Sequence, residues 1–521
     1  MSASQQKKNR QEQTDAAVNP KQERAAQAKK DARKLKILTI SFSAVLVVLL
    51  LVVIIGGVTS TGVIERNSTA VILGDHKLTA VEVKYFYNDC VNTFAQNNSN
   101  YLSYFLDTSK PLNEQKYDDT KTWADYFMDT ALTNARNTYA VYDEAVSKGI
   151  TLSEDDQKTI ESNLSMLKLY ASMRGYSSVN KYIAAMYGRG CNEASYRKYM
   201  EVCQLASSYD TQFRNSLTYT DQQLQDKEAE DFDAYSDYTY RMYQVKLTDY
   251  ADSSAEDKDA ANAAGREKAK AVAEEIKSDT TNETTFIQSV KTHCTEKEQD
   301  TYATNDDATL SQNVRRANLP SSIQEWVSDS SRKAGDVAVL PVGDEGSETG
   351  FIVVYYLSKR DNSETKMVNV RHILIKTSDT VTMEQAREKI EEIKASYEEN
   401  PTEENFASLA SSKSEDSGSK NNGGLYENVY EGAMVKEFND WIFDPARKEG
   451  DVGIVETEYG CHLIYFVSKG EQSYRDYLIT QALISDDYNA WFTGLTDNYT
   501  ETRKGGLRWV NTALTLQTSS N

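Results

Sequence analysis

The sequence predicts an α+β protein of several domains, with a single N-terminal transmembrane helix, a helical domain and two tandem copies of a smaller α+β domain. Three observations lead to this fold class: an uninterrupted apolar run, a long stretch of helical periodicity with few Pro and Gly, and an internal repeat in the second half of the chain. A chain of 521 residues is too long for one hydrophobic core.

The composition excludes several classes of function. The formal net charge is −21, although residues 1–36 carry ten Lys or Arg and only four acidic residues. The acidic excess therefore lies beyond that tail, and we expect no binding to nucleic acid, which needs basic patches. Four His and five Cys without a CxxC pair or metal-ligand spacing predict neither a metal site nor a disulfide framework. Gly-rich nucleotide motifs are absent, so no cofactor is predicted.

The apolar run covers residues 37–58, which is 22 residues. As a helix it would be about 33 Å long and could cross a bilayer once. Its basic flank comes first, so residues 1–36 are predicted to be a disordered cytoplasmic tail and the bulk of the chain extracytoplasmic. A cleaved signal peptide is the alternative, but the long basic region favours a retained anchor. The predicted location is the cell membrane, with one pass.

Residues 65–235 are predicted to form the helical domain. It begins with a short strand over 70–73, and Thr79 and Glu82 then have the spacing of a capping box that starts a helix. Further helical periodicity covers 118–147, 153–170, 178–187 and 192–216.

The repeat is found by comparing the chain with itself. The segment 326–337 matches 441–452 at an offset of 115 residues, and 350–359 matches 460–469 at an offset of 110. We therefore expect two tandem domains at 236–361 and 366–472, followed by a C-terminal helix and strand over 473–521.

The second copy alternates strand and helix patterns. Residues 368–376 alternate as a strand, Thr382 caps a helix, 434–443 have helical spacing, and 452–457 with 461–467 form a closing hairpin. An antiparallel sheet with surrounding helices follows from this order. Cys461 and His462 should point to opposite faces of their strand, which disfavours a Cys–His nucleophile. Whether Cys191 and Cys203 pair stays open.

The second copy resembles the parvulin-type peptidyl-prolyl isomerases. The segments that carry the resemblance are VRHILI (370–375), FASLA (406–410), SEDS (414–417), GGL (423–425), GAMVKEF (432–438), GDV (450–452) and TEYGCHLI (457–464). The wider layout is similar to extracytoplasmic foldases of the PrsA, SurA and PpiD type. This likeness implies that 65–235 is a chaperone domain, completed by 473–512.

The resemblance also implies a site. Leu425, Met434 and Phe438 would line a cup for the proline ring, with Tyr459 close to the substrate. His372 and His462 would form the paired histidines of the family, and Asp416 would face the reacting amide. The alternatives for these residues are ordinary core positions, a hydrogen-bonded core histidine pair and a solvated loop acid.

The first copy departs from this pattern. Ile352 stands at the position of His462, the first strand has no His, and Leu319 and Ile323 replace Met434 and Phe438. We therefore expect an inactive module.

The predicted function is peptidyl-prolyl cis-trans isomerisation by a foldase that assists translocated proteins, with unfolded polypeptides containing X–Pro bonds as partners and the membrane contacted through one helix. The alternative is a holdase chaperone without catalysis. Nothing in the sequence predicts an oligomeric state.

Overall fold

The computed structural model describes residues 3–7, 29–30, 36, 41, 43–48, 61–510 and 512. The chain divides after Leu217 and before Tyr488: the segment between these points forms one compact unit, and the segments on either side form another.

The membrane prediction needs correction. Within the described residues, no helix has both the length and the apolar character that crossing a bilayer requires. Most of the predicted span at 37–58, and of the predicted tail at 1–36, lies outside the described residues. The transmembrane helix in the predicted fold class is contradicted by this finding, and so is the location in the cell membrane that was derived from it.

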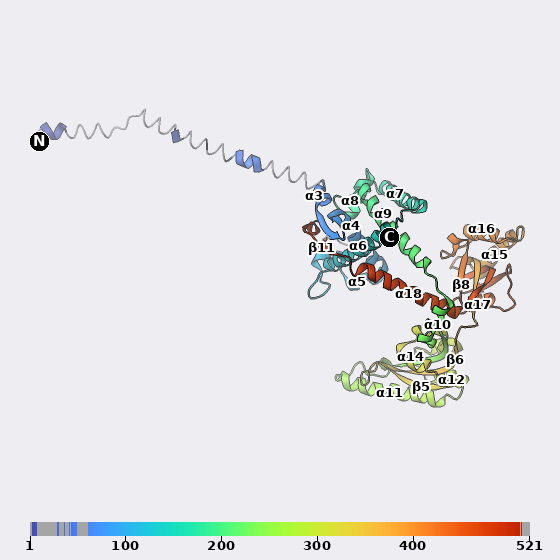
Figure 1. Ribbon diagram of the computed structural model, residues 1–521. Coiled ribbons are helices and arrows are strands. Elements are labelled where there is room, and N and C mark those ends of the chain that lie inside the picture. Colours follow the sequence, from blue (N-terminus) through green and yellow to red (C-terminus); the bar gives the residue numbers. More distant parts are fainter. Residues whose placement is uncertain are drawn as a thin grey trace. The chain divides into compact units, whose positions relative to one another are not determined.

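The first unit combines a small antiparallel sheet with long helices (Figure 1). The strand order is β11-β1-β2, so a strand from the end of the chain pairs with one from its beginning. Thr79 makes the predicted capping box at the start of α4, and Ser153 makes another at the start of α7. The elements are α3 Val63–Asn67, β1 Thr69–Leu73, β2 His76–Thr79, α4 Ala80–Asn97, α5 Leu102–Phe105, η1 Leu112–Glu114, α6 Trp123–Ser147, α7 Glu154–Met173, α8 Val179–Tyr187, α9 Glu193–Ser216, the end of α18 (Tyr474–Thr496), β11 Glu501–Arg503 and η7 Gly505–Trp509.

The core of this unit lies between the sheet and helices α4 and α6. Val83 and Phe86 of α4 pack with Phe127 and Leu132 of α6, all of them buried. All five cysteines lie in the described part of the chain and are free thiols, so Cys191 and Cys203 do not pair.

The second unit contains two four-stranded antiparallel sheets of the same strand order, β4-β3-β6-β5 and β8-β7-β10-β9. The elements are α10 Asp221–Glu230, η2 Phe232–Tyr235, β3 Asp237–Lys246, η3 Leu247–Asp249, α11 Lys258–Asp279, α12 Glu283–His293, α13 Gln299–Tyr302, η4 Asp306–Thr309, β4 Leu310–Arg315, η5 Arg316–Asn318, α14 Ser321–Ser328, β5 Val337–Val342, β6 Gly350–Arg360, β7 Lys366–Lys376, α15 Met383–Glu398, α16 Glu403–Lys413, η6 Lys420–Asn422, β8 Leu425–Val429, α17 Lys436–Ile442, β9 Val452–Thr457, β10 Gly460–Ser473 and the start of α18.

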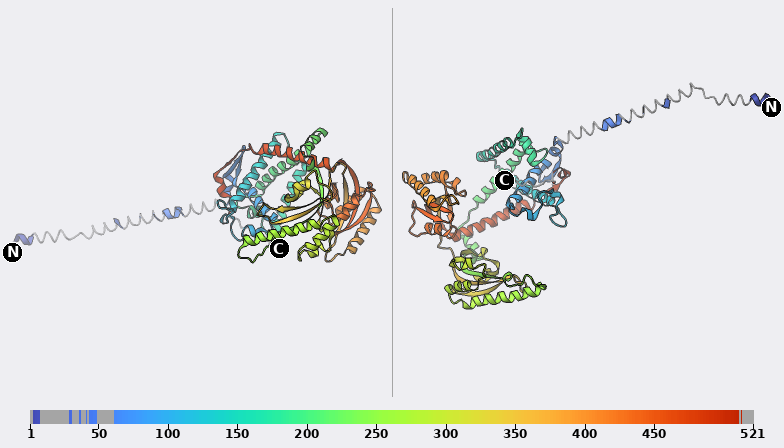
Figure 2. Two further views of the ribbon diagram at one scale, coloured as in Figure 1. Left: turned by 90° about the horizontal axis from the view of Figure 1, so that it is seen from below. Right: turned by 180° about the vertical axis from the view of Figure 1, so that it is seen from behind.

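Helices cover both faces of each sheet. In the first sheet α11 and α12 pack on one face and α14 on the other, and Figures 1 and 2 show α11 running along its sheet. In the second sheet α15 and α16 cover one face and α17 the other. The sequence repeat has a structural counterpart, because Arg332 lies 4.5 Å from the ring of Trp326 and Arg447 lies 4.2 Å from the ring of Trp441.

Candidate functional site

Strands β7 and β10 pair in the second sheet and bring two histidines together. The register joins Leu374 to His462 and His372 to Ile464, so both imidazoles point to the face covered by α17. The two Nδ1 atoms are 3.2 Å apart, and the rings stack with centroids 5.4 Å apart. Both side chains are buried.

The histidine pair lies inside a chain of hydrogen bonds that has one direction. His372 Nε2 lies 2.9 Å from Asp416 Oδ2, and a carboxylate can only accept, so this nitrogen carries the proton. The His372 Nδ1 atom then accepts from His462 Nδ1. The remaining nitrogen, His462 Nε2, accepts from the Thr457 hydroxyl at 2.9 Å. Both imidazoles are thereby fully hydrogen-bonded in the neutral form.

Asp416 is the end point of this chain, and the loop that holds it is fixed to β7. The backbone N–H of Glu415 donates to Leu374 O at 2.8 Å. Asp416 Oδ2 accepts from the Ser419 hydroxyl at 2.5 Å and from the Tyr426 hydroxyl at 3.0 Å, besides His372. The carboxylate is thus held in one orientation by three side chains.

The surroundings lower the pKa values of His372, His462 and Asp416, but for different reasons. Burial lowers the pKa of His372, although Asp416 opposes the shift, and burial together with His372 lowers the pKa of His462 to about 4. Burial of Asp416 opposes its ionisation, but hydrogen bonds from Ser419 and His372 outweigh it and hold the pKa of this carboxyl well below its usual range. At neutral pH the network therefore carries a single negative charge, on Asp416.

Aromatic side chains form an apolar wall beside the histidines. Phe438 of α17 is buried and meets His462 edge-on, with ring centroids 5.3 Å apart, and Tyr426 lies 5.1 Å from His372. Met434 is partly buried against the same cluster. The predicted helix over 434–443 needs correction, because α17 begins at Lys436 and Met434 precedes it.

Leu425 is not brought to this face. It pairs with Arg371, whose side chain alternates with that of His372, so Leu425 points to the opposite side of the sheet. Tyr426 pairs with Val370 and takes the place beside the histidines. Tyr459 lies in the β9–β10 turn with its side chain 58% exposed, and its backbone N–H donates to Thr457 Oγ1 at 3.2 Å.

Three residues of the network were not predicted from the sequence: Thr457, Ser419 and Tyr426. Thr457 had a detectable signal, because in the β9–β10 hairpin it shares a face with Val455, the register partner of His462. For Tyr426 the signal depended on the register of β8, which the sequence did not determine. Ser419 lies in a loop without periodicity.

The first sheet has apolar side chains where the second has this network. Ile352 takes the place of His462 and pairs with Gln244, and the position of His372 is taken by Met242. Leu319, Ile323 and Ile352 are all buried in one apolar cluster. Within residues 237–360 there is no counterpart of the histidine pair.

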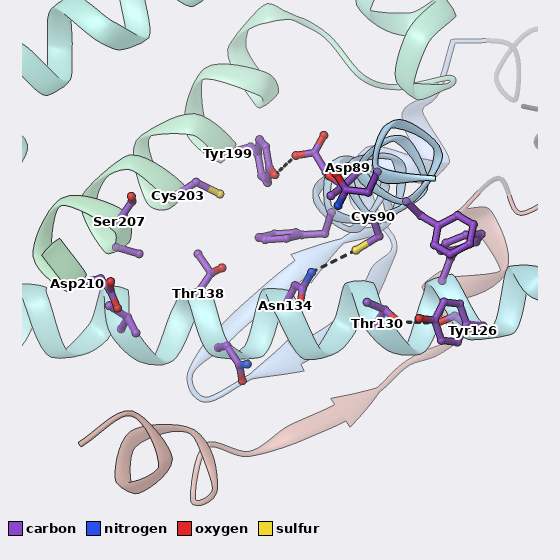
Figure 3. A pocket seen from close by; sticks show the side chains of 18 of the residues that line it. Asp89, Cys90, Tyr126, Thr130, Asn134, Thr138, Tyr199, Cys203, Ser207 and Asp210 are labelled. Carbon is purple, nitrogen blue, oxygen red and sulfur yellow. Dashed lines mark hydrogen bonds between the residues drawn. The ribbon is translucent and has the colours of Figure 1, made fainter. Parts of the chain in front are cut away.

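A separate pocket of about 710 Å³ lies in the helical unit (Figure 3). Its lining residues come from α4, α6, α9 and the end of α18, and they combine aromatic rings with neutral amides and hydroxyls. They are Phe86, Asp89, Cys90, Thr93, Phe94, Asn97, Asn98, Tyr126, Phe127, Thr130, Asn134, Asn137, Thr138, Val141, Tyr199, Cys203, Ala206, Ser207, Asp210 and Phe492.

Comparison with known proteins gives matches to isomerases and chaperones. The PPIC-type PPIase domain family matches residues 355–469. Chaperone SurA of Methylococcus capsulatus is 33% identical over 158 residues, and Chaperone SurA of Pseudomonas savastanoi pv. phaseolicola is 35% identical over 139. These alignments cover 30% and 25% of this chain, and each covers 32% of the relative, so the chain matches about a third of their length.

Solved structures give a weaker likeness. The peptidylprolyl isomerase PrsA of Bacillus cereus is 26% identical over 28% of this chain and 55% of its own, with a TM-score of 0.18. The family match at 355–469 covers the strands and helices that hold the histidine pair. The resemblance inferred from the sequence is therefore confirmed, and this chain contains a parvulin-type peptidyl-prolyl isomerase domain and is related to the SurA chaperones.

Proposed function

We propose that the chain acts as a peptidyl-prolyl cis-trans isomerase on unfolded polypeptides, with His372, Asp416 and His462 as the catalytic network. The observation that carries this proposal is the single-direction hydrogen-bond chain from Thr457 to Asp416. It lies beside an apolar wall that suits a proline ring.

Rotation about an X–Pro bond breaks no covalent bond. The barrier, roughly 18–20 kcal/mol, comes from the loss of amide resonance as the bond twists. A catalyst therefore needs a grip on the ring and an environment that disfavours the planar, charge-separated amide. In this proposal Phe438, Met434 and Tyr426 hold the ring, and Tyr459 contacts the flanking chain. The fixed negative charge of Asp416 then opposes build-up of charge on the carbonyl oxygen of the planar form.

Neutral histidines fit an orienting role in this mechanism. Because burial lowers the pKa of both, neither imidazole holds a positive charge that would neutralise Asp416 at physiological pH. Their contribution is to fix the position of the carboxylate.

We further propose that the module over 236–361 lacks isomerase activity and serves as a spacer or peptide-binding surface. Its support is the apolar cluster of Leu319, Ile323 and Ile352 at the equivalent place. The domain limits 65–235, 366–472 and 473–521 given above are part of the same proposal.

The test measures cis/trans exchange of an Xaa-Pro peptide by NMR in the presence of the full chain. We expect acceleration by the unmodified protein, and a loss on the order of tenfold or more, about 1.4 kcal/mol in barrier height, for Asp416→Ala and for Met434→Ala. Glu415→Gln is the matched control, because it removes an adjacent exposed carboxylate that, among the described residues, accepts from the Lys376 backbone N–H alone. No acceleration by the unmodified chain would refute the proposal.

A holdase function is the second candidate, and the 710 Å³ pocket favours it. Its apolar rings and neutral hydrogen-bonding groups suit a segment of unfolded chain. In this case the Asp416→Ala variant would suppress aggregation of an unfolded protein as well as the unmodified chain does. Equal loss of both activities would argue against an independent holdase.

A further inference from the structure

The pocket of the helical unit has an unbalanced charge. Its lining includes two carboxylates, Asp89 and Asp210, and none of its lining residues is Lys, Arg or His. A pocket of this size, within the roughly 300–1,000 Å³ typical of ligand sites, can take up a side chain with its flanking backbone.

The two carboxylates differ in their partners. Asp210 accepts a hydrogen bond from the Tyr488 hydroxyl at 2.6 Å and lies 3.7 Å from Arg214 Nε, so its charge is compensated within the unit. Asp89 accepts from the Tyr199 hydroxyl (Figure 3), and within the described part of the chain no cationic side chain forms an ion pair with it.

Asp89 is also partly shielded from water. Its side chain is half-buried on α4, and burial raises the pKa of its carboxyl despite the hydrogen bond from Tyr199. A carboxylate in this environment gains more from a cation than one on the surface, because the attraction is screened less.

Aromatic rings line the same pocket as this carboxylate. The ring of Tyr199 is 4.9 Å from that of Phe86, and the ring of Phe94 is 5.4 Å from that of Phe127. Ring faces attract cations, and the rings also offer apolar contact to a methylene chain. Neutral donors and acceptors such as Asn134 and Thr130 line the same pocket.

We propose that this pocket binds a lysine or arginine side chain of an unfolded polypeptide, with the cationic group at Asp89 and the aliphatic stem against the rings. The inference rests on the proposed binding of unfolded chains and names the residue type that the helical unit selects. Acidic segments are disfavoured, because the pocket has no cation to receive them.

The test uses the full chain and three fluorescein-labelled peptides of the same apolar sequence, which differ at one central position: Lys, norleucine or Glu. Fluorescence anisotropy at low salt should give binding of the Lys peptide about tenfold or more tighter than the norleucine peptide, equal to about 1.4 kcal/mol, and the weakest binding for Glu. The preference for Lys should shrink as salt is added.

Asp89→Asn is the decisive variant, because the amide oxygen still accepts from Tyr199 while the charge is lost. It should bind the Lys and norleucine peptides equally. Asp155→Asn is the matched control: it removes a carboxylate of the same unit whose side chain is 89% exposed, and it should keep the preference.

Equal binding of the Lys and norleucine peptides by the unmodified chain would overturn the inference, and this comparison needs no variant to fold. A full Lys preference in Asp89→Asn would overturn the assignment to Asp89. Absence of binding by all three peptides would instead refute the underlying proposal of client binding, and the isomerase measurement would be unaffected by it.

Discussion

Tyr426 is the residue that most distinguishes this site from what the sequence predicted. Its hydroxyl donates to Asp416 Oδ2, its ring lies against His372, and burial raises the pKa of its hydroxyl. It thus combines an apolar contact with a polar one, and the substitution to Phe separates the two.

For Tyr426→Phe we expect a decrease in kcat/KM of about tenfold or more, because one hydrogen bond to a charged group, worth roughly 1.5–3 kcal/mol, is lost while the ring remains. The decrease should fall mainly on kcat, since the apolar wall is kept. Kinetics of X–Pro exchange would measure it, and a change confined to KM would contradict the role given to the hydroxyl.

Thr457 offers a second test at this scale. Thr457→Val keeps the shape but leaves His462 Nε2 buried without a donor, so the free energy of unfolding should fall by about 1–3 kcal/mol. Urea unfolding gives this value, and ¹⁵N NMR of the imidazoles reports the tautomers. Thr457→Ser restores the donor and should recover the wild-type tautomers; a variant that does not would contradict the hydrogen-bond direction.

At the residue scale, period-two alternation predicts the sheet face on which the two histidines lie. It does not predict the face on which their neighbours on β8 lie. His372 and His462 lie on strands whose apolar neighbours show their face. Leu425 and Tyr426 are adjacent, so a one-residue difference in the register of β8 exchanges their faces, and only the pairing with Val370 and Arg371 decides between them.

Among the elements, the turn that leads into β8 is a tight constraint on the site. Gly424 has φ +74° and its carbonyl accepts from the His372 N–H at 2.9 Å. A Cβ at Gly424 would lie 2.3 Å from His372 O. This turn therefore depends on glycine for two reasons, backbone conformation and space.

Gly424→Ala should destabilise the protein by more than about 2 kcal/mol, because strain from positive φ adds to a backbone clash. Gly175→Ala is the matched control, since Gly175 has φ +74° with open space around its Cβ position, and it should cost only about 1–2 kcal/mol. Thermal unfolding compares the two. Equal effects would show that the clash is relieved by backbone movement.

Helix starts were predicted well where a side chain caps them and poorly elsewhere. Thr79 and Thr382 each accept the expected backbone hydrogen bond. Helix α17 starts at Lys436, and its N-cap Val435 makes no side-chain hydrogen bond. Without a capping signal, the i, i+4 spacing of Met434 and Phe438 predicted a helix start at Met434, two residues too early.

For the whole molecule, the buried histidines predict acid sensitivity. Their folded pKa values lie below the unfolded value of about 6.5, so the unfolded chain binds more protons as the pH falls from there toward 4. The contribution of the neutral histidines to the free energy of unfolding is therefore fully present above about pH 6.5, and it is lost as the pH falls toward 4. The lowered pKa of Asp416 also makes the protein less stable as the pH falls, but only below the unfolded pKa of this carboxyl, about 3.9.

Between pH 7 and 5 His462 alone should lower the free energy of unfolding by about 2 kcal/mol. His462→Gln, which cannot titrate, should show a correspondingly smaller change over the same range. Urea midpoints at the two pH values measure both proteins. An equal slope in the variant would mean that the imidazole is protonated in the folded state.

At this scale the sequence predicted both a repeat of two α+β modules and a membrane span. Two sheets of the same strand order correspond to the repeat, whereas the described residues contain no helix that could span a membrane. A repeat leaves matching residues that any alignment of the chain with itself detects. An apolar run is less informative, because its length and hydropathy describe only the segment and not what surrounds it.

The pairing of β11 with β1 affects the order of events during synthesis. Tyr499 and Leu73, which are 426 positions apart, share a hydrogen bond, so the first sheet cannot close until synthesis has passed β11. Both isomerase-like modules have by then been made, whereas the edge of β1 stays open to water and to neighbouring chains. Until β11 has been synthesised, the protein is therefore itself an incompletely folded chain.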